Sequence, residues 1–168
     1  MPRLKRLLVI LLLILACVGC DQTSKSIAKQ YLPESEIITL MKDTVRLHYV
    51  RNSGAFLSMG ASWPTQVRTV VFTVGVTVIV AAVFFYLLFA PSISKATVIG
   101  LSLICGGGIG NLIDRIAYDG AVVDFLNLGI GPLRTGIFNI ADVAVSFGAI
   151  LILWDHVRTR RAANPRLG

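Results

Sequence analysis

Two aspartates lie in apolar surroundings, where a carboxylate is costly. Asp142 falls in the apolar stretch 136–154, and Asp124 interrupts the apolar run Ala121–Leu128. An ionisable residue in a membrane segment marks a functional site by default. If the two carboxyl groups lie close together, they cannot both ionise cheaply, so one keeps a proton while the other acts as a base. Such a pair can activate water and protonate a leaving amine, which is aspartic peptidase chemistry. Their positions in the sequence do not show whether the two acids lie close together in space.

The stretch around Asp142 has one polar side if it is helical. The residues at helical spacing are Thr135, Asn139, Asp142 and Ser146. Their polar stripe must face other helices or a wet cavity, because lipid would leave it unpaired. At 1.5 Å per residue, Asp142 is expected roughly 9 Å below the outer end of this helix. The alternative is that Asp142 only locks helix packing through Asn139 or an arginine.

The composition excludes an ordinary soluble globule. The 168 residues are 55% hydrophobic and 15% charged, and the mean hydropathy is +0.75; soluble domains are about one quarter charged. The net charge of +7 comes from residues at the chain ends and beside apolar runs. This pattern is typical of membrane proteins and not of nucleic-acid binding. His48 and His156 are too few and too separated to suggest a metal site.

Apolar runs long enough for a bilayer predict an all-α membrane protein with four transmembrane helices. The expected spans are residues 4–20, 67–90, 95–113 and 136–154. Basic residues at both tails favour cytoplasmic termini, which an even number of spans allows. Segments 21–66 and 114–135 then lie together on the periplasmic side, and residues 1–168 form one integral-membrane domain.

Short segments refine this prediction. Thr39–Val50 has β-branched residues in partial alternation, so a small β-rich cradle is expected at the outer membrane face. Ile14–Cys17 is similar to a lipoprotein cleavage box, although the further spans favour a retained first helix. The glycine run Gly106–Gly110 predicts close helix packing.

Five ordered motifs carry a resemblance to a known family. They are Asp-Gln-Thr-Ser-Lys at 21–25, Asn-Ser-Gly-Ala at 52–55, Gly-Asn-Leu-Ile-Asp-Arg at 110–115, Val-Val-Asp-Phe at 122–125 and Phe-Asn-Ile-Ala-Asp at 138–142. Over residues 4–156, the chain resembles the bacterial lipoprotein signal peptidases, also called signal peptidase II. The resemblance implies an inner-membrane aspartic endopeptidase that cuts prolipoproteins just before the diacylglyceryl-cysteine, near the periplasmic face.

The resemblance also implies roles for individual residues. The catalytic pair falls on Asp124 and Asp142. The positions expected to bind substrate are Asn52, Asn111, Arg115 and Asn139, and those expected at the site rim are Asp21, Lys25 and Gly54. No metal or organic cofactor is implied. The expected partners are diacylglyceryl-prolipoproteins and membrane lipid, without nucleic acid, and a monomer is expected. One departure is that Phe56 follows Ala55 directly, where the family places two small residues before an aromatic.

Other interpretations of these residues remain open. Asp21 and Lys25 stand four apart in the order that favours a helix ion pair. Asp114 and Arg115 fall at a helix end, where charged side chains normally extend to the interface. The alternative functions are a small proton-coupled transporter with Asp142 as its relay, and a non-catalytic membrane scaffold.

Overall fold

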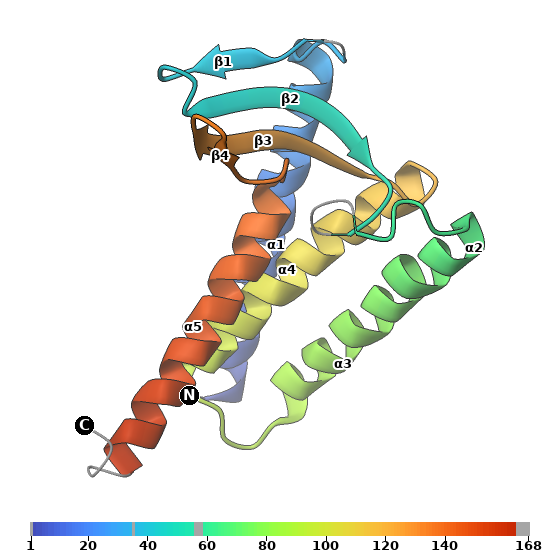
Figure 1. The fold of residues 1–168 in the computed structure, drawn as a ribbon. Coiled ribbons are helices and arrows are strands. Elements are labelled where there is room, and N and C mark those ends of the chain that lie inside the picture. The colour runs from blue at the N-terminus through green and yellow to red at the C-terminus, as the bar shows by residue number, and fades with distance from the viewer. Residues whose placement is uncertain (1, 35, 56–58, 164–168) are drawn as a thin grey trace.

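The computed structural model describes residues 2–34, 36–55 and 59–163. Long helices carry a small sheet at one end (Figure 1). The elements are α1 (Arg3–Tyr31), β1 (Ile38–Leu40), β2 (Val45–Asn52), α2 (Thr65–Arg68), the π-helix η2 (Thr69–Gly75), α3 (Val76–Phe89), α4 (Lys95–Ala117), β3 (Val122–Ile130), β4 (Leu133–Arg134) and α5 (Ile140–Ala163). The start of α1 and the end of α5 both lie away from the sheet (Figure 1).

Helix α4 is the central helix, and it packs against α1, α3 and α5. Its glycines permit this close approach. A Cβ added at Gly106 would lie 2.6 Å from the Cβ of Cys17 in α1, and one at Gly107 would collide with the carbonyl oxygen of Ala141 in α5. Small residues let membrane helices approach closely, so the predicted role of the glycine run is confirmed. Helix α1 continues unbroken through Cys17.

The sheet is antiparallel, with the strand order β1-β2-β3-β4. Strands β1 and β2 come from the segment in which β structure was expected, and β3 contains the apolar run around Asp124. The register places Val50 opposite Asp124 and Asn52 opposite Val122. Because these partners are adjacent, the end of β2 lies beside Asp124.

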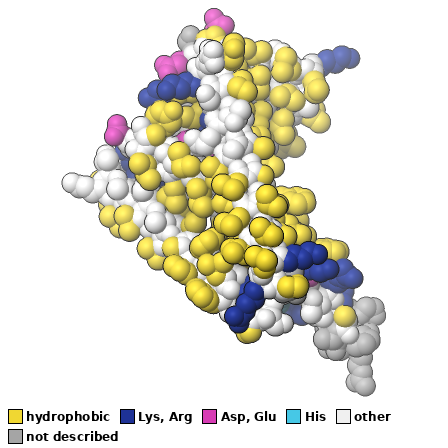
Figure 2. Space-filling view, turned by 180° about the vertical axis from the view of Figure 1, so that it is seen from behind, with side chains coloured by type: hydrophobic (Ala, Val, Ile, Leu, Met, Phe, Trp, Pro, Cys, Tyr) yellow, Lys and Arg dark blue, Asp and Glu magenta, His cyan; other side chains and the backbone are white. Residues whose placement is uncertain are grey.

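The outer surface of the helices is apolar. In the described part of the chain, three helical segments are long and apolar enough to cross a membrane, namely Thr65–Phe89, Lys95–Ala117 and Ile140–Ala162. They contain the span expected at 95–113 and most of the spans expected at 67–90 and 136–154. The remaining expected span, 4–20, lies within α1. Figure 2 shows hydrophobic side chains spread over the helices on one face of the molecule.

The start of the last helix differs from the prediction. Helix α5 begins at Ile140, so Thr135 is not on it and Asp142 lies in its first turn. The expected depth of Asp142 within this helix was therefore wrong. The reason is that the preceding residues belong to the sheet: β4 pairs with β3, and Phe138 exchanges backbone hydrogen bonds of 2.8 and 2.9 Å with Leu126.

The close packing of α4 on α5 gives a stability prediction. Gly107→Ala should lower the free energy of unfolding by about 1–3 kcal/mol, because a backbone carbonyl cannot move aside as a flexible side chain can. Thermal unfolding of the purified protein in detergent measures the change. The control is Gly19→Ala in α1, where an added Cβ meets nothing within 4 Å. Equal melting temperatures for the two variants would contradict the prediction.

Candidate functional site

Asp124 and Asp142, the two aspartates with apolar sequence neighbours, line one cavity of about 200 Å³. Asp124 comes from β3 and Asp142 from the first turn of α5. The candidate residues that share this lining are Asn52, Gly54, Asn111 and Arg115. The fold therefore brings together side chains from β2, the segment after it, α4, β3 and α5, which are far apart in the sequence.

Asp124 is buried and accepts two amide hydrogen bonds. Its Oδ2 accepts from Asn52 Nδ2 at 3.0 Å, and its Oδ1 accepts from Asn139 Nδ2 at 2.7 Å. Burial raises the pKa of Asp124 to about 6, and the nearby Asp142 adds to this rise. The bonds from Asn52 and Asn139 lower the pKa and oppose part of the shift, because they stabilise the charged carboxylate.

Asp142 is held by a reciprocal cap at the start of α5. Its backbone N–H donates to Asn139 Oδ1 at 3.0 Å, and its Oδ2 accepts the backbone N–H of Asn139 at 3.1 Å. This is the geometry of a capping box, which satisfies donors that a helix start leaves unpaired. The other carboxylate oxygen accepts from Asn111 Nδ2 at 3.0 Å. The orientation of Asp142 is therefore set from both α4 and α5.

Arg115 reaches the cavity from α4 and is buried. Its Nη2 donates to the carbonyl of Gly54 at 3.1 Å, which ties α4 to the segment after β2. Its Nε has no hydrogen-bond partner among the described residues. The expectation that Asp114 and Arg115 extend to the interface was wrong, since both are buried. They turn inward because the sheet and the segment after β2 cover this end of α4 and supply polar partners.

A buried ionic cluster lies behind the cavity. Lys25 Nζ lies 2.7 Å from Asp21 Oδ2 and 3.0 Å from Asp114 Oδ2. Lys25 is 4% exposed and Asp21 is fully buried. The interpretation of Asp21 and Lys25 as a simple helix ion pair at the rim was therefore incomplete, and Asp114 was missed. Its signal was present in the sequence: Asn111, Asp114 and Arg115 share one face of a helix at i, i+3 and i+4.

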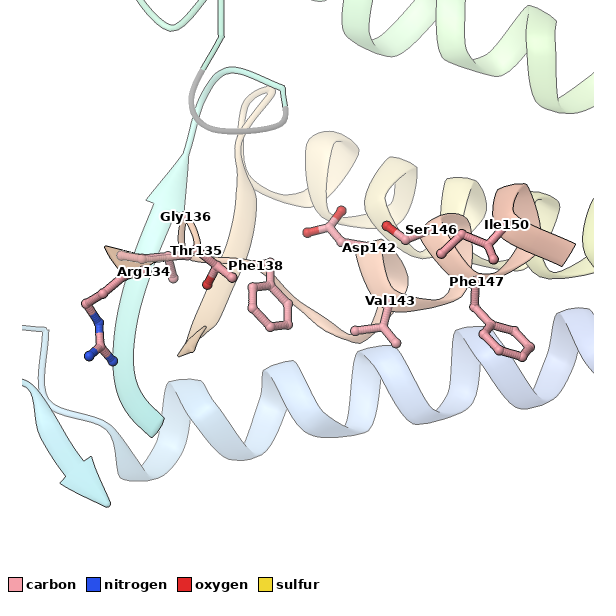
Figure 3. Close-up of a pocket in the computed structure, with 10 residues that line it drawn as sticks. Arg134, Thr135, Gly136, Phe138, Asp142, Val143, Ser146, Phe147 and Ile150 are labelled. Atoms are coloured by element: carbon pink, nitrogen blue, oxygen red, sulfur yellow. The ribbon is translucent and has the colours of Figure 1, made fainter. Parts of the chain in front are cut away.

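An apolar groove of about 490 Å³ adjoins Asp142 on α5 (Figure 3). Val143, Phe147 and Ile150 supply apolar side chains, and Arg134 and Thr135 lie at its sheet end. In Figure 3, Asp142 and Val143 extend from opposite sides of α5. The groove and the cavity have Asp142 and Ile137 in common, so an apolar surface leads directly to the carboxyl site.

Not every expected site residue lies in the cavity wall. Asn139 does not line the cavity but forms hydrogen bonds with both aspartates. Asp21 and Lys25 belong to the ionic cluster and do not line the cavity either. Phe56 lies outside the described residues. Within residues 2–34, 36–55 and 59–163, no group of three or more His, Cys, Asp or Glu side chains is arranged to hold a metal ion.

Apolar helices joined to a buried carboxyl cavity are the features of a membrane enzyme, and a solved structure agrees. A bacterial membrane enzyme determined at 2.3 Å resolution superposes with a TM-score of 0.77 and 26% identity, covering 89% of this chain and 87% of that one. A sequence model of the signal peptidase (SPase) II family matches residues 13–158.

Curated relatives agree with the family match. The lipoprotein signal peptidase of Moorella thermoacetica is 39% identical over 86% of this chain and 90% of its own length. That of Streptococcus pneumoniae is 33% identical over 89% and 93% of the two chains. The chain belongs to the signal peptidase II family, and with that membership it is a peptidase that removes prolipoprotein signal peptides. The transporter alternative has no support among these relatives.

The hydrogen bonds to Asp124 give a titration prediction. Asn52→Ala should raise the pKa of Asp124 above its value of about 6, because it removes a donor that stabilises the carboxylate. The rise should be about one to two pH units, since a hydrogen bond to a charged group is worth about 1.5–3 kcal/mol and one pKa unit corresponds to about 1.4 kcal/mol. Infrared titration of the carboxyl C=O stretch measures it, with Asp124→Asn identifying the band.

A matched control for this titration is Asn127→Ala. Asn127 lies on β3, the strand that holds Asp124, but its amide bonds Thr135 and Arg134 and not Asp124. Its variant should leave the titration of Asp124 unchanged. If Asn52→Ala gave the same midpoint as the control, the Asn52 bond would not be tuning Asp124.

Proposed function

We propose that Asp124 and Asp142 are the catalytic pair of an aspartic endopeptidase. Its substrate is a diacylglyceryl-modified prolipoprotein, which it cuts just before the lipidated cysteine. The observation that carries this proposal is the shared cavity. Two carboxyl groups from distant segments line it, and each is fixed by side-chain amides. Pre-orientation of this kind is what general acid–base catalysis needs.

The proposed reaction begins with a water molecule between the two carboxyl groups. One carboxylate accepts a proton from the water, and the water oxygen bonds to the carbonyl carbon of the scissile peptide. The other carboxyl group, which carries a proton, donates a hydrogen bond to the carbonyl oxygen. When the C–N bond breaks, a proton passes to the departing amine. The shared proton is assigned to the pair of Asp124 and Asp142, because coupled groups titrate together.

Polar residues around the pair are proposed to hold the substrate peptide. Arg115 supports this role because it lines the cavity and its buried Nε has no partner among the described residues. That N–H could donate to a peptide carbonyl. The side chains of Asn52 and Asn111 also line the cavity, while Asn139 stays behind it. We propose that Asn52 and Asn111 orient both the acids and the substrate, and that Asn139 orients the acids.

The proposed membrane arrangement has four spans, with α1 as the first. Leu7–Cys20 of α1 carries no charged residue and is long enough, together with its flanks, to cross the bilayer. The sheet and the site then lie at the periplasmic face of the inner membrane, and both termini lie in the cytoplasm. The groove beside Asp142 supports lateral entry of substrate, because its apolar lining suits the acyl chains of the lipidated cysteine. The whole chain, 1–168, acts as one monomeric domain.

Substitution of either aspartate tests this proposal. Asp124→Asn and Asp142→Asn should each lower kcat by about 10²–10⁴-fold, because an amide cannot exchange the proton that catalysis requires. The measurement is cleavage of a diacylglyceryl-prolipoprotein by the purified enzyme in detergent. Mass spectrometry of the product should show a new N-terminus at the lipidated cysteine.

Asp119→Asn is the matched control. Asp119 is exposed, follows α4, and does not line the cavity. Its variant should cleave at the wild-type rate. Wild-type rates from Asp124→Asn or Asp142→Asn would refute the catalytic pair, and a product cut elsewhere would refute the proposed cleavage position.

A further inference from the structure

Two buried carboxylates outside the cavity hold the backbone next to the proposed catalytic acids. Asp21 Oδ1 accepts the backbone N–H of Ala141 at 2.9 Å. Asp114 Oδ2 accepts the backbone N–H of Val123 at 2.9 Å. Ala141 immediately precedes Asp142, and Val123 immediately precedes Asp124. The same contact is therefore made twice, once for each acid, from α1 and from α4.

Lys25 joins these two carboxylates. Its Nζ lies 2.7 Å from Asp21 Oδ2 and 3.0 Å from Asp114 Oδ2, and all three side chains are buried. Two like charges buried together are strongly unfavourable unless a cation lies between them. Without Lys25, the two carboxylates would separate or take up protons, and their hold on the backbone would weaken.

Lys25 also reaches Asp142 through Asn111. The ammonium donates to Asn111 Oδ1 at 3.0 Å, which fixes the amide oxygen toward the cation. The NH₂ group must then point the other way, where it donates to Asp142 Oδ1 at 3.0 Å. A reversed amide would place NH₂ against the ammonium, which has no acceptor to offer. Lys25 thus determines which end of Asn111 faces Asp142.

We propose that Lys25 is a positioning residue that couples the two catalytic aspartates through Asp21, Asp114 and Asn111. It touches neither the cavity nor the reacting atoms. Instead, one ammonium keeps two carboxylates and one amide in the orientations that fix Asp124 and Asp142. This inference rests on the proposed function, because it takes those two acids to be catalytic.

A purely structural role would give different kinetics from a positioning role. A residue that only holds helices together changes the amount of folded enzyme and leaves the kcat of the folded fraction unchanged. A positioning residue lowers kcat in folded enzyme, because small displacements of catalytic groups cost about 10²-fold. It leaves KM near its wild-type value, since the hydrogen bonds of Asn52 and Arg115, which are also proposed to hold the substrate, do not involve Lys25.

The test is Lys25→Met in the full-length purified enzyme, with a diacylglyceryl-prolipoprotein as substrate. We expect kcat to fall by about 10²-fold and KM to change by less than about threefold. The limb of the pH profile near pH 6 should also move to higher pH. The other groups facing Asp124 are Asp142, Asn52, Asn139 and Arg115, and none of them is substituted. The variant removes the positive charge of Lys25, which lowers the pKa of Asp124.

Lys29→Met is the matched control, because Lys29 lies one turn further along α1 and is exposed. It should keep both the wild-type kcat and the wild-type pH profile. Folded Lys25→Met with wild-type kcat and profile would overturn the proposal. Asp124→Asn is measured alongside: if that variant stays active, the proposed function fails, and if only Lys25→Met stays active, the positioning role alone fails.

A second variant covers a failure of Lys25→Met to fold. Lys25→Met/Asp114→Asn removes one positive and one negative charge, so the cluster keeps the formal charge of −1 that Asp21, Asp114 and Lys25 give it. We expect this folded double variant to show the same loss of kcat. A wild-type kcat would overturn the proposal, and so would failure of both variants to fold, because that result assigns the cluster to stability.

Discussion

The site depends on one buried amide, the side chain of Asn139. It is fully buried, and its Nδ2 donates to Asp124 Oδ1 at 2.7 Å and to Asn111 Oδ1 at 3.1 Å. Its Oδ1 accepts the backbone N–H of Asp142. An Asn side chain has two donors and one acceptor group, and here all of them face groups of the site. Since a buried network is rigid only when its members are satisfied, Asn139 fixes the acid on the strand relative to the acid on the helix.

The surroundings of this network explain why so many polar groups are placed at the end of a membrane helix bundle. A carboxylate facing lipid would be unpaired, so each acid needs partners from protein. The sheet supplies Asp124 and Asn52 on one side of the cavity, and the sheet-facing end of α4 supplies Asn111 and Arg115. Close packing at Gly107 lets α4 approach α5, and close packing at Gly110 lets it approach α1, where an added Cβ would lie 2.6 Å from Asp21 Oδ2.

Sequence patterns predicted the apolar helices and the β-rich segment, because hydrophobic runs and β-branched residues report burial directly. They did not predict the start of α5. Thr135 lies at helical spacing from Asn139 and Asp142 by coincidence. Helix α5 does not extend back to Thr135 because β4 and Phe138 pair with β3, and this tertiary pairing leaves no pattern in the local sequence. The apolar context singled out Asp124 and Asp142, the resemblance supplied the other candidate site residues, and the structure brings most of them to one cavity. The second carboxylate of the ionic cluster, Asp114, was missed because a charge near a helix end is usually exposed.

The corrected start of α5 matters for the chemistry. At the first turn, Asp142 Oδ2 accepts the backbone N–H of Asn139, one of the donors that a helix start leaves unpaired. Asp124 lies on a strand, where burial raises its pKa to about 6. Two neighbouring acids divide acid and base roles when their environments differ. A deeper Asp142, in mid-helix, would have had no free backbone donor, because those N–H groups bond within the helix. The helix start therefore makes the surroundings of the two acids unequal.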